Sequence, residues 1–263
     1  MKKIIVSTAL VLAIGASFAL AQQPPQPGQT PPPQPAQKTA PQQSEARPVT
    51  VMQPMPDFTL PALEGGQVTL SALRGKNVLI VFFRGYAAEN AWCTICHYQY
   101  AELVMRELRE KVREKYGMDV LFVLPYDKDV VQKWQAVVPE QLEKIKKWKN
   151  PADPAALDEA GRRRMERSKM IFPLDMAPAD IEAKPGEMAR PFPVLMDADR
   201  ALTKRLGIFA TEWGGSKVEQ GIPSVYIVDK AGILRFKYIG QNTVDRPSYD
   251  YLFKILDCVN AGK

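Results

Sequence analysis

Cysteine and histidine are both scarce in this chain of 263 residues, which has three cysteines and a single histidine, His97. Three cysteines are too few for a disulfide scaffold. One histidine argues strongly against a Cys/His zinc cluster, and a Ser-His-Asp triad would have to use His97 itself. The formal net charge of +6 includes Lys2 and Lys3 at the N-terminus, and the mild remaining excess does not favour nucleic acid. We therefore expect neither a metal site nor a nucleic-acid interface.

The N-terminal segment has the features of an export signal. A basic start, Met1-Lys2-Lys3, precedes an apolar stretch over residues 4–20 that ends in Ala19-Leu20-Ala21. This pattern predicts a secretory signal peptide, residues 1–21, cut after Ala21. The alternative is an uncleaved membrane anchor, because the stretch is near the lower length limit for a membrane span. Either way we expect an exported, periplasmic or secreted protein, with no stable membrane insertion once the signal is cleaved.

Residues 22–49 are rich in proline and glutamine and hold almost no large apolar side chains. Such a segment cannot bury enough apolar surface to offset the entropy of ordering. We therefore predict a disordered linker over 22–49 and a folded domain over 50–263.

Apolar runs and helical periodicity alternate along this domain. The runs at 78–84 and 119–125 predict buried strands, and a helix over 93–116 between them implies a parallel crossover. The predicted inner face of that helix comprises Tyr100, Leu103, Val104, Leu108 and Val112. Further strands are predicted at 193–197, 223–229 and 233–239, the last antiparallel, and further helices at 127–137, 140–149, 155–170, 199–206 and 249–259. The pattern is that of an α/β domain.

The segment before residue 193 carries less regular features. Residues 171–191 contain four prolines and are predicted to form an irregular linker. The cluster Arg162-Arg163-Arg164 lies in the predicted helix 155–170. Its pairing with Glu159 and Glu166 predicts a solvated helix face, and the alternative is a docking patch for an acidic partner.

Two cysteines stand at the start of the helix that follows the first buried strand, in the sequence Trp92-Cys93-Thr94-Ile95-Cys96-His97. The unpaired amides and the positive dipole end of a helix N-terminus stabilise an anion. We therefore expect a lowered pKa for Cys93, which would attack a disulfide as a thiolate, while Cys96 would resolve the mixed disulfide. Cys258 is predicted to be a half-buried helix residue without a redox role.

The order of these elements resembles that of the thioredoxin-like redoxins, and more narrowly the alkyl hydroperoxide reductase/thiol-specific antioxidant (AhpC/TSA) peroxiredoxin-like group and its exported thiol-disulfide relatives. The resemblance covers about residues 50–126 and 191–260 and implies a thioredoxin-like fold, a central mixed sheet flanked by helices, with an enlarged helical insertion at about 127–190. The matching stretches are Pro56-Asp57-Phe58, Leu73-Arg74-Gly75-Lys76, Trp92-Cys93-x-x-Cys96, residues 192–197, Gly221-Ile222-Pro223-Ser224 and residues 227–232.

The resemblance also bears on the reaction. Peroxidases of this group carry Pro-x-x-x-Thr-x-x-Cys, whereas this chain has Tyr86 and Asn90 at those distances before Cys93, and Glu89 and Cys93 at those distances before Cys96. Ile222-Pro223 instead looks like the cis-proline loop with which thioredoxin-type exchangers position an extended substrate, and Trp92 would form a wall of the site. We therefore expect a thiol-disulfide oxidoreductase that acts on protein substrates and exchanges electrons with a reductase or oxidase.

Three alternatives remain open. One cysteine of the pair, Cys93 or Cys96, could reduce hydroperoxides, with its sulfenate resolved by the other or by Cys258. Cys93-x-x-Cys96-His97 also spells the attachment motif for haem c, in which His97 would be the axial ligand of an electron carrier. Without haem no cofactor is expected, and His97 is predicted to be a partly exposed residue whose charge modulates Cys93. In the third alternative the two cysteines form a structural disulfide in a module that only binds a partner.

Overall fold

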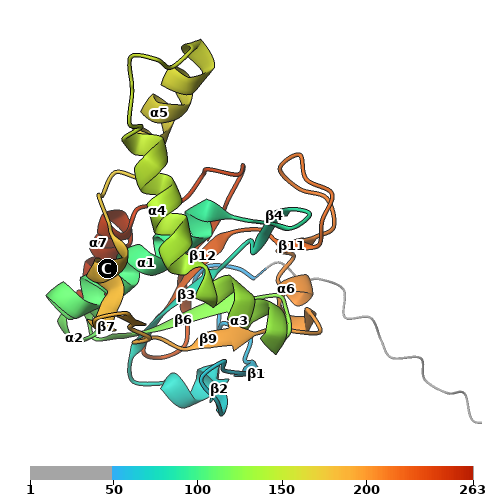
Figure 1. Ribbon diagram of the computed structural model, residues 1–263. Helices are drawn as coiled ribbons and strands as arrows, with labels where there is room; N and C mark the ends of the chain where they lie inside the picture. The colour runs from blue at the N-terminus through green and yellow to red at the C-terminus, as the bar shows by residue number, and fades with distance from the viewer. Residues whose placement is uncertain (1–48, 263) are drawn as a thin grey trace, which may run out of the picture. The chain divides into compact units, whose positions relative to one another are not determined.

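The computed structural model describes residues 49–262, so the predicted signal peptide and the predicted linker up to residue 48 lie outside the described residues. The described part is organised around a five-stranded sheet with the strand order β13-β12-β3-β6-β9 (Figure 1). Strands β3, β6 and β9 run parallel, whereas β12 runs antiparallel to both β3 and β13. The predicted mixed sheet is therefore confirmed. Its strands are β3 (Asn77–Phe82), β6 (Met118–Leu124), β9 (Val194–Met196), β12 (Ser224–Val228) and β13 (Leu234–Ile239).

Successive residues of β3 point to opposite faces of the sheet and enter two separate cores. Leu79 and Val81 belong to the larger core, which includes residues of α1 (Thr94–Glu110), α4 (Val138–Lys149) and α7 (Tyr249–Asn260). Val78, Ile80 and Phe82 belong to the other core, with residues of β1 (Thr59–Pro61) and α6 (Ala201–Arg205). Every residue of β3 is buried, as its uninterrupted apolar run predicts.

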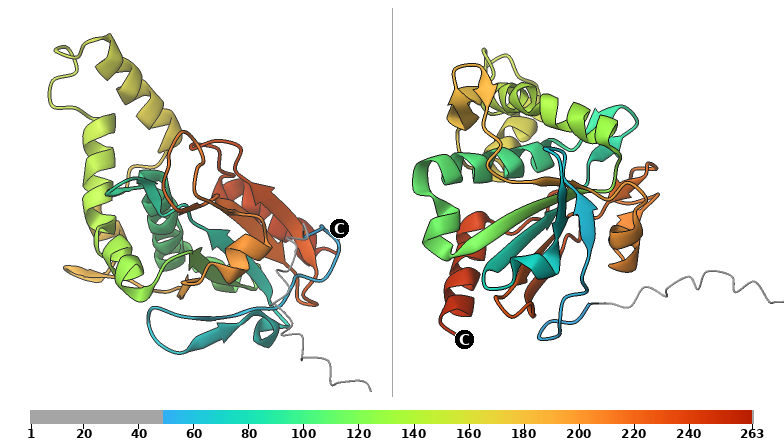
Figure 2. Two further views of the ribbon diagram at one scale, coloured as in Figure 1. Left: turned by 90° about the vertical axis from the view of Figure 1, so that its right-hand side faces the viewer. Right: turned by 90° about the horizontal axis from the view of Figure 1, so that it is seen from below.

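The segment between β6 and β9 is mainly helical. It contains α3 (Lys128–Ala136), α4, α5 (Glu159–Ile171), a 3-10 helix (Pro178–Ile181) and a hairpin of β7 (Glu182–Lys184) and β8 (Glu187–Met188). Figures 1 and 2 show that α5 projects further from the sheet than the rest of this segment. Helix α5 begins later than predicted because Asp158 accepts a hydrogen bond from the Gly161 N–H and caps it. The hairpin makes the predicted irregular linker partly wrong.

The helix predicted over 93–116 is broken in two. Helix α1 ends at Glu110, Lys111 adopts a left-handed conformation (φ 50°), and α2 (Val112–Tyr116) follows. Leu108 of α1, predicted to face inward, is 43% exposed, so its prediction was wrong. Within residues 49–262, no helix combines the length and apolar character needed to cross a membrane.

Short hairpins complete the described part of the chain. They pair β1 with β2 (Gln67–Thr69), β4 (Tyr86–Ala88) with β5 (Ala91–Trp92), and β10 (Phe209–Ala210) with β11 (Gln220–Gly221). A 3-10 helix (Leu70–Leu73) follows β2. The β4–β5 hairpin delivers the chain to the cysteine pair at the start of α1.

Candidate active site

The cysteine pair is positioned by the turn that follows β3. Cys93 is the residue immediately before α1, and its N–H donates a 2.8 Å hydrogen bond to the Gly85 carbonyl. Gly85 has φ +73°, and a side chain there would collide with the ring of Tyr126. The Tyr126 hydroxyl in turn donates to the Arg84 or Glu219 carbonyl and accepts from the Tyr86 N–H. Only glycine fits this place, and it fixes Cys93 against the end of β3.

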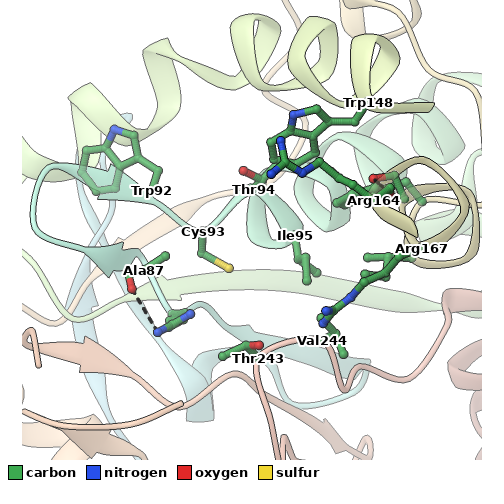
Figure 3. Close-up of a pocket in the computed structure, with 14 residues that line it drawn as sticks. Ala87, Trp92, Cys93, Thr94, Ile95, Trp148, Arg164, Arg167, Thr243 and Val244 are labelled. Carbon is green, nitrogen blue, oxygen red and sulfur yellow. Dashed lines mark hydrogen bonds between the residues drawn. The ribbon is translucent and has the colours of Figure 1, made fainter. Parts of the chain in front are cut away.

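Cys93 lies at the inner end of an open pocket of about 320 Å³. Its sulfur points into the pocket (Figure 3), yet only 4% of the residue is accessible, and Cys96 is fully buried behind it. Residues of the β4–β5 hairpin and of the helical segment between β6 and β9 line the pocket and enclose Cys93. Both cysteines are free thiols in this structure.

The two thiols have opposite pKa shifts. A hydrogen bond from the Cys96 thiol lowers the pKa of Cys93 to about 6, against the effect of burial. The charges of Arg246 and Arg84 and the backbone N–H of Cys96 lower it further. Burial raises the pKa of Cys96 well above its ordinary value, as do its hydrogen bond to Cys93 and the charge there. At neutral pH the pair therefore holds one thiolate, on Cys93, and one proton, on Cys96.

Arg84 supplies a buried positive charge that has no carboxylate partner among the described residues. The residue is only 4% exposed. Its guanidinium donates to Gln220, to the Ser216 hydroxyl and to the carbonyls of Ala87 and Trp213. All four acceptors are neutral, so the charge stays available to an anion in the pocket that it lines.

Arg246, a half-buried residue in the loop before α7, supplies a second positive charge near Cys93. Its Nη1 donates to the carbonyls of Asn242 and Asp245. Its Nε and Nη2 are buried without a hydrogen-bond partner in the described part of the chain. Because unpaired buried donors are rare and unfavourable, these nitrogens mark a place where negative charge is stabilised, as it is on Cys93.

His97 is fully buried, which contradicts the prediction of a partly exposed, charged residue. Its ring stacks on Trp134 with the ring centroids 4.6 Å apart. Its Nδ1 lies 3.2 Å from the Cys93 carbonyl and its Nε2 lies 3.0 Å from the Trp134 carbonyl. Burial lowers the pKa of His97 to about 4, so the ring is neutral at physiological pH and adds no charge beside Cys93.

The other residues predicted from the sequence take different places. Trp92 lines the pocket and stacks on Tyr86 at 4.1 Å between ring centroids. Ile222 and Pro223 are not among the residues that line it. No cis peptide bond occurs in residues 49–262, so the predicted cis-proline loop is wrong. Cys258 is exposed on α7, not half-buried.

Pro223 does not position a substrate in the predicted way, because the segment around it is already hydrogen-bonded to the protein's own backbone. The Ile222 N–H donates to the Ile208 carbonyl, and the Pro223 carbonyl accepts from the Gly240 N–H. These groups are therefore not available to an extended substrate in the way the resemblance implied.

Four arginines of the site were not predicted from the sequence to lie beside the cysteines. Arg84 and Arg246 act on Cys93, and Arg164 and Arg167 of α5 line the pocket. Only Arg164 lay in a cluster that the sequence made conspicuous. No group of three or more His, Cys, Asp or Glu side chains in the described residues could hold a metal ion.

A mixed sheet with a cysteine pair at the N-terminus of the helix after its central strand defines a thioredoxin-like redoxin. Comparison with protein families narrows this class: the chain belongs to the AhpC/TSA family, whose model matches residues 51–237. Membership makes it a redoxin of the thiol oxidoreductase or peroxidase type, with thiol-based redox partners.

Solved structures of peroxiredoxins share the fold. A mutant of peroxiredoxin 6 from Arenicola marina is 12% identical with a TM-score of 0.51, and the match covers 81% of this chain and 74% of that one. AhpC from Mycobacterium tuberculosis is 13% identical with a TM-score of 0.50, and the match covers 82% of this chain and 96% of that one. No curated protein matches the sequence significantly.

Proposed function

We propose that Cys93 and Cys96 exchange a disulfide with a protein substrate. The observation that carries the proposal is the division of roles between the two sulfurs. Cys93 faces an open pocket and is held as a thiolate, while Cys96 is sealed behind it and keeps a proton that it donates to Cys93. A nucleophile and a resolving thiol in this arrangement are what stepwise exchange requires.

In the first step the Cys93 thiolate attacks one sulfur of the substrate disulfide. A Cys93–substrate S–S bond forms, the substrate S–S bond breaks, and the released thiolate takes up a proton. The Cys93 charge that helped to raise the pKa of Cys96 is now gone, so Cys96 loses its proton more readily. Cys96 then attacks Cys93 and releases the second substrate thiolate, which is protonated. The substrate gains two electrons and two protons, and the Cys93–Cys96 disulfide returns to the dithiol through a thiol-based redox partner.

Trapping of the intermediate tests this scheme. In a Cys258→Ser background, which removes the exposed third thiol, Cys96→Ser is expected to accumulate a mixed disulfide with insulin or another disulfide protein. Cys93→Ser is expected to form none and to lose insulin reduction. Unchanged insulin reduction by the Cys93→Ser variant would refute the proposed nucleophile.

A second candidate function, reduction of hydroperoxides, is favoured by membership of the AhpC/TSA family. The Cys93 thiolate would attack the peroxide, release an alkoxide or hydroxide that is protonated, and become a sulfenic acid. Cys96 would then displace water and close the disulfide. Tyr86 and Asn90 stand where peroxidases of the family carry Pro and Thr, which argues against this candidate. Peroxide consumption that turns over with an added dithiol, at rates above those of disulfide exchange, would favour it.

The surroundings of His97 do not fit an axial ligand of haem c. Both ring nitrogens face backbone carbonyls, and one ring face is stacked on Trp134. An axial ligand needs a free ring nitrogen that points into an open crevice. We accordingly propose a reaction of the thiols alone. A Soret absorbance band in the purified protein would overturn this choice.

We also propose that the protein is exported, because residues 1–21 have the organisation of a signal peptide. N-terminal sequencing of protein recovered from the periplasmic fraction is expected to begin at Gln22. A chain that keeps Met1 and sediments with membranes would support the anchor instead.

A further inference from the structure

The pocket over Cys93 is strongly asymmetric in charge. Fourteen residues line it, among them Arg84, Arg164 and Arg167, and none of them is Asp or Glu. Arg84 lies buried near Cys93, whereas Arg164 and Arg167 are exposed on α5. A substrate that entered this pocket would meet positive charge both at its rim and at its inner end.

The charged residues of α5 divide into those that form ion pairs and those, Arg162 and the two rim arginines, for which the described residues supply no carboxylate partner. Arg163 pairs with Glu159, and Lys169 pairs with Glu166. Neither Arg164 nor Arg167 has an ion-pair partner within residues 49–262. They are three positions apart, so they share one face of the helix, and that face is the one that lines the pocket. Figure 3 shows Arg167 extending from α5 toward Val244.

Apolar side chains complete the walls between the rim and Cys93. Trp92 and Ile95 come from the segment that carries the cysteines, and Trp148 and Phe172 come from the ends of α4 and α5. Such walls suit the aliphatic and aromatic parts of a peptide, and the guanidinium groups suit carboxylates beside them. The helical segment between β6 and β9 thus supplies much of the wall that a substrate would touch.

We propose that this basic rim, formed by Arg164 and Arg167 beside the aromatic wall of Trp148, selects disulfides in acidic peptide segments. The inference rests on the proposed exchange function and names its substrate class. Carboxylates that flank the substrate cysteine reach Arg164 and Arg167 while the disulfide lies against Cys93. The unpaired rim charges steer an acidic chain toward the pocket.

The test compares two disulfide peptides that differ only in charge, with Asp and Glu flanking the cysteine in one and Asn and Gln in the other. For the full chain, kcat/KM is expected to favour the acidic peptide by roughly 2- to 30-fold at low salt, the range for two exposed ion pairs. This preference is expected to shrink in 0.5 M salt and to approach one in Arg164→Gln/Arg167→Gln. The matched control, Arg162→Gln/Arg163→Gln, loses the same charge from the same helix and is expected to keep the preference.

Binding of serine-substituted peptides, which cannot exchange, separates this inference from the function on which it rests. Exchange with both peptides at equal rates, or equal loss of preference in both double variants, would overturn the acidic rim and leave the exchange function standing. Tighter binding of the acidic serine peptide without any exchange would overturn the function and support the rim. If kcat/KM for oxidised glutathione fell as much in Arg164→Gln/Arg167→Gln as kcat/KM for the acidic peptide, the rim would be assigned to a small anionic disulfide. That result would overturn the acidic peptide as the occupant of the rim.

Discussion

Replacement of Cys96 by alanine should release the thiol of Cys93 from its strongest stabilising contact. The hydrogen bond from the Cys96 thiol is the largest cause of the lowered pKa of Cys93, which stands at about 6. A hydrogen bond to a charged group contributes about 1.5 to 3 kcal/mol, and about 1.4 kcal/mol corresponds to a tenfold change in an acid dissociation constant. We therefore expect the Cys93 pKa to rise to about 7 or 8 in Cys96→Ala.

The assay is the rate of alkylation by iodoacetamide between pH 4 and 10, in a Cys258→Ser background so that the exposed thiol gives no signal. At pH 7 the thiolate fraction of Cys93 is expected to fall from about nine tenths to between about one tenth and one half. Cys96→Ser, which keeps a hydroxyl donor at the same place, is the control and should titrate close to the parent. A Cys96→Ala variant that still titrates near pH 6 would refute the assigned cause.

Three further outcomes follow from the same geometry. Because Cys93 is already deprotonated above about pH 6, reduction of the disulfide takes up one proton for two electrons, and the midpoint potential of the pair should fall by about 30 mV per pH unit between pH 6 and 9. A slope of about 60 mV per pH unit up to pH 9 would contradict the lowered pKa. The pKa of His97 is lowered to about 4, so below pH 6.5 the unfolded chain binds a proton that the folded chain does not, and the folded state loses stability as the pH falls. In urea denaturation, the free energy of unfolding of the parent protein should therefore drop by about 3 kcal/mol more between pH 6.5 and 4 than that of His97→Phe. Gly85→Ala should lower the urea midpoint and slow exchange, since the new methyl group meets the Tyr126 ring at positive φ; a wild-type midpoint would show that the turn adjusts freely.

Regular elements with a clear hydrophobic period were predictable from the sequence. The run at 78–84 reads as a strand buried on both faces, and β3 is buried at every residue. The Asp158 cap and the break at Lys111 depend on single backbone conformations, which the hydrophobic pattern does not encode. Helix α1 was therefore predicted too long and α5 too early.

Within the site, local chemistry was predictable and tertiary contacts were not. The spacing of Cys93 and Cys96 places one behind the other on a helix, and the lowered pKa of Cys93 follows from that placement. The burial of His97 depends on Trp134, which lies on α3 and packs on it from outside the motif. The pairing of Pro223 with Gly240 likewise comes from the neighbouring strand. Neither contact has a signature in the sequence around the cysteines.

The four arginines of the site form an inner pair, Arg84 and Arg246, and an outer pair, Arg164 and Arg167. The inner pair affects the redox potential of the cysteines, and the outer pair affects the choice of substrate. Arg84 and Arg246 act on the Cys93 thiolate and favour the reduced form of the pair. Together with the hydrogen bond from the Cys96 thiol, the largest cause, they lower the pKa of Cys93 from 9 to about 6. At pH 7 this whole shift stabilises the reduced form of the pair by about 1.4 kcal/mol, which raises its midpoint potential by about 30 mV. Because the pKa of Cys93 is lowered, the stabilisation of the reduced form is fully present above pH 9 and is lost as the pH falls through 6. Arg164 and Arg167 lie on the exposed rim and are not among the main causes of this pKa. Mutation of α5 is therefore expected to change the choice of substrate while the midpoint potential of the cysteine pair is kept.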